Sequence, residues 1–175
     1  MRDDMEWKTL LATTRLSDKD SNHRNEFDDD YKRIVTSPAF RRLQDKTQVF
    51  PLERLDFIHT RLTHSLEVAM IARTLVSEIV RLLQQDSLTE TDSSKQEMIN
   101  YQSDIARIVE CASLLHDIGN PPYGHFGEDI IRQWFKKKLP QILAEHSDVA
   151  DEFLASPYVH DFYHFEGNAQ SLRIV

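Results

Sequence analysis

Residues 114–128 read Leu-Leu-His-Asp-Ile-Gly-Asn-Pro-Pro-Tyr-Gly-His-Phe-Gly-Glu, and the rest of the chain is organised around this stretch. An adjacent pair, His116 and Asp117, closes an apolar helical run. A turn rich in glycine and proline follows, and His125 and Glu128 then open the next helix. The stretch holds three of the four glycines and two of the six prolines. Because polar side chains cluster here around a turn between two helices, we expect the chemistry of the protein at this place.

The composition is that of an ordinary globular protein. A chain of 175 residues fits one domain, residues 1–175, and can bury a substantial core. No window approaches about eighteen uninterrupted apolar residues, and the first residues lack the apolar core of a signal peptide. The single cysteine, Cys111, excludes an internal disulfide and agrees with a reducing compartment. We therefore expect a cytoplasmic protein without a membrane span.

The net charge of −8 argues against a general nucleic-acid binder, although nucleic acid stays possible as a regulator that the composition does not indicate. A polyanionic substrate would need a metal ion or a local basic cluster. One basic cluster lies within thirty residues: Lys32, Arg33, Arg41, Arg42, Lys46, Arg54 and Arg61. A solvated helix face is the alternative interpretation of this cluster.

Apolar spacings of three and four residues predict two long amphipathic helices. The first covers residues 60–85 and should bury Val68, Ile71, Leu75, Ile79 and Leu82. The second follows Ser103 and should bury Ile105, Ile108, Val109, Ala112 and Leu115. Residues 86–100 between them are polar and predict a connection. No useful length of strand alternation is present, so the fold class is predicted to be all-α.

Shorter segments complete this helical prediction. Helices are expected over residues 27–35, 39–43 and 124–138, and Pro140 should begin another that runs to about Phe153. Residues 46–51 should be extended. The chain stops in an apolar helical run without a polar tail, so we expect it to be the N-terminal part of a longer polypeptide.

Two histidines are predicted to face the interior. His64 lies one turn before Val68, and His116 lies one turn after Ala112. Two imidazoles with the carboxylate of Asp117 suit a divalent ion such as Mn²⁺, Zn²⁺, Fe or Ni, and carboxylate-rich sites accept Mg²⁺. A hydrogen-bonded core histidine is the usual alternative for either residue alone. Their pairing beside the turn favours the metal site.

Four blocks of sequence occur in an order that resembles one enzyme family. They are residues 41–50 (RRLQDKTQVF), 60–68 (TRLTHSLEV), 116–128 (HDIGNPPYGHFGE) and 165–173 (FEGNAQSLR). Together they resemble the deoxyguanosine triphosphate triphosphohydrolases (dGTPases), which are HD-domain metal-dependent phosphohydrolases. Asn120 and Gly167 point to the dGTPase type. The resemblance implies an HD-domain helical bundle, truncated at its C-terminal side.

The resemblance also implies an activity, namely hydrolysis of a deoxynucleoside triphosphate, with dGTP favoured, to deoxynucleoside and inorganic triphosphate. His64, His116 and Asp117 would hold the metal ion, Mn²⁺ or Mg²⁺. His125 would transfer the proton, and Glu128 would orient the imidazole of His125. From the residues alone, His125 could instead be a helix-start residue and Glu128 a capping-box carboxylate. A homo-oligomer is implied as well.

The same resemblance assigns substrate contacts. Gln48 matches the position that contacts the sugar 3′-hydroxyl, and an amide can both donate to and accept from that group. Cationic candidates for phosphate or nucleotide contacts are Arg41, Arg42, Lys46 and Arg61, since guanidinium groups match phosphate. Asn168 is a further pocket candidate.

The chain departs from the family's pattern in two places. The family's fourth metal ligand is an aspartate beyond the fourth block, and nothing in the context of Asp104 or Asp161 marks either as its substitute. Loss of a ligand should weaken metal binding. His59 stands where relatives often carry arginine, so one phosphate contact should differ. Two alternatives stay open: an HD phosphohydrolase for another nucleotide, such as a nucleoside monophosphate, and a non-catalytic nucleotide-binding HD fragment or subunit.

Overall fold

The computed structural model describes residues 7–14, 25–48, 59–86, 93–145 and 147–175. Within these ranges the chain forms helices and no strand, apart from one isolated antiparallel bridge between Thr47 and Thr60. The prediction of an all-α fold is therefore confirmed. Among the described residues, no helix combines the length and the apolar character that a membrane crossing requires.

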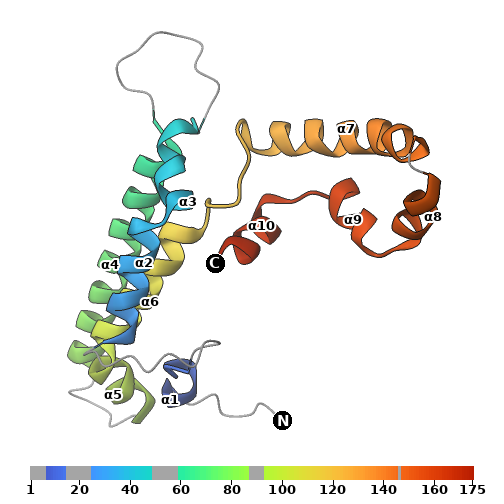
Figure 1. Ribbon diagram of the computed structural model, residues 1–175. Coiled ribbons are helices and arrows are strands. Elements are labelled where there is room, and N and C mark those ends of the chain that lie inside the picture. Colours follow the sequence, from blue (N-terminus) through green and yellow to red (C-terminus); the bar gives the residue numbers. More distant parts are fainter. Residues whose placement is uncertain (1–6, 15–24, 49–58, 87–92, 146) are drawn as a thin grey trace. The chain divides into compact units, whose positions relative to one another are not determined.

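The helices follow the order shown in Figure 1. Their bounds are α1 Trp7–Leu10, α2 Glu26–Thr36, α3 Pro38–Arg41, the 3₁₀ helix η1 Arg42–Asp45, α4 Arg61–Asp86, α5 Ser93–Asn100, α6 Gln102–Leu115, α7 Gly124–Ala144, α8 Ser147–Ala155, α9 Tyr158–Tyr163 and α10 Gly167–Ile174.

The chain divides into two compact units, each built from two separate pieces of sequence. The first unit comprises residues 1–41 and 65–115, and the second comprises residues 42–64 and 116–175. That all 175 residues form one domain stays a prediction. Of the candidate catalytic, metal-binding and substrate-contact residues, only Arg41 belongs to the first unit, and the others belong to the second.

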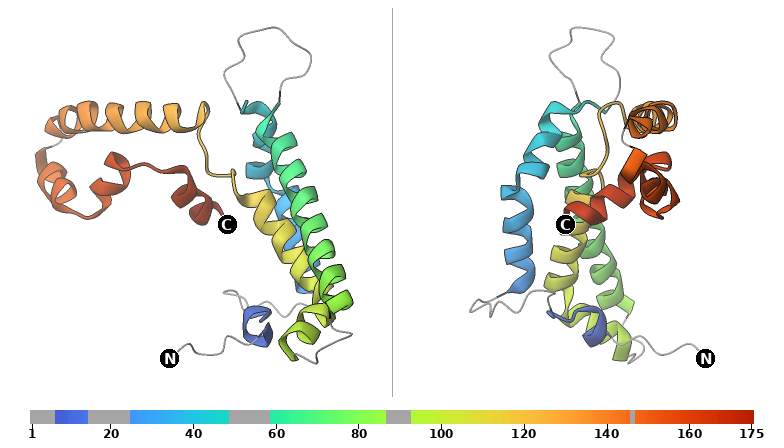
Figure 2. Two further views of the ribbon diagram at one scale, coloured as in Figure 1. Left: turned by 180° about the vertical axis from the view of Figure 1, so that it is seen from behind. Right: turned by 45° about the vertical axis from the view of Figure 1, so that its right-hand side comes forward.

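The first unit is a bundle in which α2, α4 and α6 lie side by side, as both views of Figure 2 show. Asn25 caps α2 by accepting from the Phe27 backbone N–H at 3.0 Å, and its amide donates to Asp104 of α6 at 3.2 Å. Val76 of α4 packs with Ile105 and Ala106 of α6. Partly buried apolar residues pack around that cluster: Trp7, Leu11, Met98, Tyr101 and Val109.

Helix α4 buries a different face from the predicted one. The residues that α4 buries are Arg61, Ser65, Ala69, Val76 and Val80. Most of the predicted stripe is exposed instead, with Ile71 at 54%, Leu75 at 57%, Ile79 at 44% and Leu82 at 51%. Apolar residues lie on several sides of α4, so spacing alone is satisfied by more than one face. The positions of α2 and α6 decide which face is covered.

Three smaller expectations are also corrected. On α6 the buried residues include Ala106, Cys111 and Leu114, while Ala112 is exposed. Residues 93–100 form α5 rather than a connection, because Met98 packs on the core. Pro140 lies inside α7, which continues to Ala144, and does not begin a new helix. The part of the polar connection at 87–92 and the extended segment at 49–51 lie outside the described residues.

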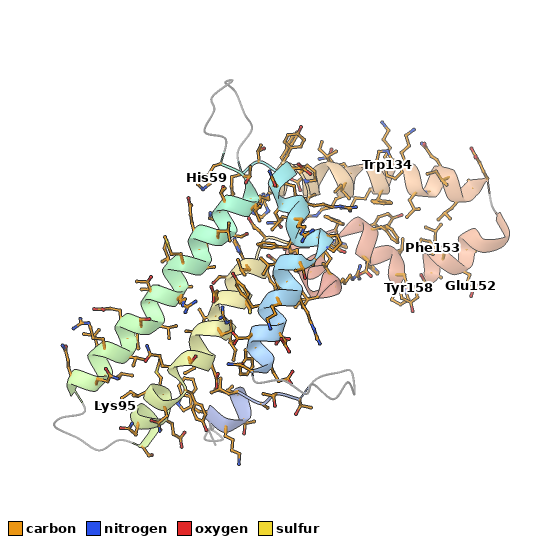
Figure 3. The ribbon with its side chains drawn as sticks, turned by 60° about the vertical axis from the view of Figure 1, so that its left-hand side comes forward. His59, Lys95, Trp134, Glu152, Phe153 and Tyr158 are labelled. Atoms are coloured by element: carbon orange, nitrogen blue, oxygen red, sulfur yellow. The ribbon has the colours of Figure 1, made fainter. Side chains whose placement is uncertain are left out.

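In the second unit the chain leads away from residues 116–123 along α7 and returns through α8, α9 and α10 (Figure 1). Helix α7 packs against α8 and α9. Aromatic rings join them: Phe135 of α7 lies 4.8 Å from Phe162 of α9, and Phe153 of α8 lies 5.9 Å from Phe162, between ring centroids. Figure 3 labels Phe153 within this group. This hairpin of helices returns the chain to residues 116–128, where α10 ends it.

We expect Leu114→Ala to lower the free energy of unfolding by about 2–5 kcal/mol, because its truncation leaves a cavity in a core. Leu114 is 1% exposed. Leu75→Ala removes the same atoms from an exposed side chain and is the matched control, with an expected change within about 0.5 kcal/mol. Chemical denaturation followed by circular dichroism measures both. Equal losses would mean that the face of α4 carrying Leu75 is buried in the folded chain.

Candidate functional site

One pocket of the second unit is lined by five of the candidate site residues named from the sequence: Gln48, Arg61, His64, Asp117 and His125. It lies where the segment leading into α4, the turn after α6 and the first turn of α7 meet. Its lining residues are Gln48, Arg61, His64, Asp117, Asn120, Tyr123, Gly124 and His125.

A candidate metal site is formed by His64, His116 and Asp117. One ligand atom from each residue lies within 4.8 Å of the other two. The two imidazole rings are 5.2 Å apart between centroids, and His116 Nε2 lies 3.6 Å from Asp117 Oδ2. His64 is in the first turn of α4 and His116 directly follows α6, so two helix ends supply the ligands. Two nitrogens and a carboxylate fit a divalent cation such as Mn²⁺, Fe²⁺ or Zn²⁺.

Asp117 is buried and its carboxylate accepts from three side chains. Arg61 Nη1 donates to Oδ2 at 2.6 Å, and Gln48 Nε2 donates to the same oxygen at 3.3 Å. Asn120 Nδ2 donates to Oδ1 at 2.6 Å. A buried carboxylate is unfavourable unless such donors compensate its lost hydration. These contacts therefore fix the orientation of the candidate ligand.

Arg61 is itself buried, at 6% exposed, and so acts first as the partner of Asp117. A phosphate contact from Arg61 stays a prediction. Its guanidinium also explains Gly124, which has a φ of +54°: a Cβ there would lie 2.8 Å from Arg61 Nη2. Nearby, Lys46 Nζ donates to the Asn120 carbonyl at 2.7 Å. Burial and the charge of Arg61 lower the pKa of Lys46, against the opposing effect of Asp117.

His125 and Glu128 form a second pair on the first turns of α7. His125 Nδ1 lies 3.0 Å from Glu128 Oε2, and the His125 side chain is 96% exposed whereas that of Glu128 is 4% exposed. The second carboxylate oxygen, Oε1, accepts from the Gly167 backbone N–H at 2.8 Å. Arg132 Nη2 donates to Oε2 at 3.3 Å. The carboxylate thus bonds two side chains of α7 and the amide of Gly167, an arrangement that differs from the capping-box pattern.

The environment keeps Glu128 ionised. Burial by itself raises the pKa of this carboxyl group. The hydrogen bonds from His125 and from the Gly167 amide, with the charges of His125 and Arg132, together outweigh that effect and hold the pKa of Glu128 below its usual range. An ionised carboxylate at Nδ1 stabilises a protonated imidazole and leaves Nε2 as the atom that can exchange a proton.

The start of α10 packs directly against both sets of residues. A Cβ on Gly167 would lie 2.0 Å from Asn120 Oδ1 and 2.9 Å from Glu128 Oε1. A Cβ on Gly119 would lie 2.2 Å from the Ser171 nitrogen, and the Gly119 N–H donates to Ser171 Oγ at 3.0 Å. Glycine is required at both positions, because a Cβ would overlap the backbone of α10 at Gly119 and the side chains of Asn120 and Glu128 at Gly167.

Four functional features escaped the sequence prediction. They are the support of Asp117 by Asn120, the contact of Gly167 with Glu128, the contact of Arg132 with Glu128, and the backbone of Tyr123. Tyr123 precedes α7 with a φ of +66°, in the left-handed region that disfavours a bulky residue. Gly167 carried a usable signal, because it is the only glycine outside residues 114–128.

Four predicted substrate contacts lie outside the pocket lining: Lys46, which donates to the Asn120 carbonyl, and Arg41, Arg42 and Asn168. Arg42 is exposed, although its charge reaches Lys46. Asn168 is exposed in the first turn of α10, where its N–H donates to Glu166 Oε1 at 3.2 Å. Arg41 is exposed at the end of α3, in the other unit. Their roles stay predictions.

The two aspartates considered as substitute ligands both have other partners. Asp161 pairs with Arg173 at 2.5 Å on the surface of the second unit. Asp104 accepts from Asn25 in the first unit. His59, labelled in Figure 3, is exposed just before α4, with its ring 6.3 Å from that of His64 between centroids.

We expect Gly167→Ala to lower the free energy of unfolding by about 1–3 kcal/mol, because the new methyl group would overlap Asn120 and Glu128. The side-chain NMR resonances of His125 should shift as Glu128 moves. Leu172→Ala, at an 85% exposed position of the same helix, is the control and should change neither quantity. Wild-type stability and unshifted His125 resonances in Gly167→Ala would refute the close approach.

Comparison with known proteins places this site within a described family. Residues 61–164 match the HD domain family, and this range includes the candidate metal ligands and the His125–Glu128 pair. A deoxyguanosinetriphosphate triphosphohydrolase-like protein of Listeria monocytogenes is 46% identical over 98% of this chain and 37% of its own length. One from Pseudomonas aeruginosa is 44% identical over 98% of this chain and 36% of its own length.

A deoxyguanosinetriphosphate triphosphohydrolase of an Enterobacter species is 38% identical over 99% of this chain and 37% of its own length. The resemblance inferred from the four sequence blocks is thus confirmed. The chain spans little more than a third of the length of these relatives.

Proposed function

The chain belongs to the HD domain family, and we propose on this basis that it carries the metal-binding and catalytic residues of a deoxynucleoside triphosphate triphosphohydrolase. The products would be a deoxynucleoside and inorganic triphosphate, and dGTP is the favoured substrate. One observation carries the proposal: His64 and Asp117 of the candidate metal cluster line the same pocket as His125, whose ring is backed by a buried carboxylate. The names of the relatives agree with this substrate class.

His64, His116 and Asp117 would hold the divalent ion, Mn²⁺ or Mg²⁺. When bound there, such an ion polarises the α-phosphate and lowers the pKa of a water molecule. Arg61, Gln48 and Asn120 keep the Asp117 carboxylate in place before any ligand arrives. The protein therefore does not have to order this side chain during binding.

His125 would transfer the proton that the leaving group needs. The 5′ oxygen of the deoxynucleoside leaves as a poor alkoxide, so a proton delivered to it from Nε2 lowers the barrier. Nδ1 is held by Glu128 Oε2 at 3.0 Å, which orients the ring and stabilises its cation. The exposure of His125 gives a substrate access to Nε2.

The triphosphate would meet a positive region at one side of the pocket. Lys46 and Arg61 lie at the candidate metal site, and Arg42 lies near Lys46. Gln48 lines the pocket and would contact the sugar 3′-hydroxyl. Arg41 and Asn168 complete the proposed contacts. We further propose a cytoplasmic homo-oligomer as the working assembly.

A second candidate is a non-catalytic HD fragment or subunit that binds a nucleotide. Within the described part of the chain the candidate cluster has three protein ligands, while the family resemblance implies a fourth, downstream aspartate. Asp161 and Asp104 are engaged with Arg173 and Asn25. Weak metal binding by this chain would favour the second candidate. A phosphohydrolase for a nucleoside monophosphate is disfavoured by the blocks at residues 46–49 (KTQV) and 168–170 (NAQ), which a minimal HD domain does not require.

We expect His64→Ala to lose bound Mn²⁺, since it removes one of three ligands, and His125→Ala to retain it. Equilibrium dialysis followed by elemental analysis measures the stoichiometry. His160→Ala, an exposed histidine of α9, is the matched control and should bind as the wild type does. Full metal content in His64→Ala would remove His64 from the ligand set.

We expect inorganic triphosphate to be released from dGTP faster than from the other three deoxynucleoside triphosphates with Mn²⁺ or Mg²⁺ present. The assay compares this chain with a version that has the full length of its relatives. His125→Ala should lower turnover by about 10²–10⁴-fold, the usual contribution of a general acid. Release by the longer version alone would support the proposed activity for the whole protein and mean that this part is inactive by itself. Silence from both would favour the non-catalytic candidate.

A further inference from the structure

Arg132, one turn after Glu128 on α7, joins three groups with one guanidinium. Its Nη2 donates to Glu128 Oε2 at 3.3 Å, and its Nη1 donates to Asp129 Oδ1 at 3.1 Å. Its Nε donates to the backbone carbonyl of Phe165 at 2.6 Å. The first two contacts are ordinary neighbours on a helix, whereas the third reaches a residue 33 positions away. The side chain is 29% exposed, so it is largely covered.

The contact with Phe165 fixes the segment on which the Glu128 carboxylate depends. Phe165 stands two residues before Gly167, whose N–H donates to Glu128 Oε1 at 2.8 Å. Arg132 therefore acts on the Glu128 carboxylate in two ways. It donates directly to Oε2, and it binds the backbone segment whose Gly167 N–H donates to Oε1. Planar guanidinium groups suit this double role because their donors are fixed relative to one another.

We propose that Arg132 is a positioning residue, which holds the Glu128 carboxylate in the orientation facing His125 by clamping α7 to residues 165–167. Its catalytic meaning rests on the proposed function, because His125 is a proton donor only in that reaction. The clamp itself is a structural interaction, and it can be tested by a measurement that does not depend on that reaction.

A simple surface ion pair on a helix is the competing interpretation of Arg132. Such pairs contribute little, and the chain offers one for comparison in Arg81 and Glu78 on α4, both about half exposed. Arg132 differs in two respects: its carboxylate partner is buried, at 4% side-chain exposure, and its shortest contact is to a carbonyl on another segment. Buried charges respond to the loss of a partner far more than exposed ones do.

Three variants separate these interpretations: Arg132→Gln, Arg132→Lys and the control Arg81→Gln. The first readout is hydrogen exchange at the Gly167 amide, measured by NMR on the 175-residue chain without substrate. Arg132→Gln should lower protection there by about tenfold or more, as loss of a charged hydrogen bond does. Arg132→Lys should lower it as well, since lysine cannot bind Glu128 and Phe165 together. Arg81→Gln should leave it unchanged.

The second readout is the pH dependence of triphosphate release by a version with the full length of the relatives. Among the residues that the structure describes, the charged and titratable side chains that bond Glu128 are His125 and Arg132, both from α7, and residues 165–167 contribute the Gly167 amide. Removing the Arg132 charge raises the pKa of Glu128. In Arg132→Gln the acidic limb of the pH profile of kcat should therefore move to higher pH. Arg132→Lys keeps the charge and should keep the limb, with kcat lower and KM unchanged.

Each outcome decides between the two interpretations. Unchanged Gly167 protection in both Arg132 variants would overturn the clamp. If Arg132→Gln fails to fold, Arg132→Lys alone still gives the exchange result. Lowered protection together with silence of the wild-type enzyme on every deoxynucleoside triphosphate would keep the clamp and reject the proposed function. Lowered protection with an unmoved acidic limb would overturn the part of the proposal that links Arg132 to His125.

Discussion

Two buried carboxylates, Asp117 and Glu128, constrain how the second unit can fold. Each has been removed from water, and an acid in that position destabilises the fold unless donors replace its hydration. Asp117 accepts from Gln48 before α4, from Arg61 at the start of α4 and from Asn120 in the turn after α6. Glu128 recruits donors from α7 and from the start of α10. Segments far apart in the chain are thereby held around one pocket.

The turn between α6 and α7 connects these two acids. Asn120 donates to Asp117 with its amide nitrogen, and its amide oxygen lies where a side chain on Gly167 would have to stand. Gly167 in turn donates to Glu128. One amide and one glycine therefore connect the surroundings of the two acids. Side-chain networks of this kind fix a single arrangement when every member has a partner.

On helix α4 the apolar pattern predicts the helix but not the face that is buried. Its large aliphatic residues lie on the exposed side, and its buried side carries smaller ones such as Ser65 and Ala69. Both faces have helical spacing, so the local pattern predicts the helix correctly but selects the wrong face. On α6 the apolar spacing predicts the helix and only part of its buried face. Periodicity reports local geometry, whereas burial depends on where other helices lie.

The sequence by itself determined the all-α class, most of the helices, the family resemblance and the candidate residues His64, His116, Asp117, His125 and Glu128. These depend on spacing along a helix or on short blocks, and both are local properties of the chain. The tertiary structure alone decided that Arg61 binds Asp117, that Gly167 binds Glu128 and that Arg132 binds Phe165. These partners are 56, 39 and 33 residues apart. No local spacing records such pairings, because they form only when the folded backbone brings two buried groups together.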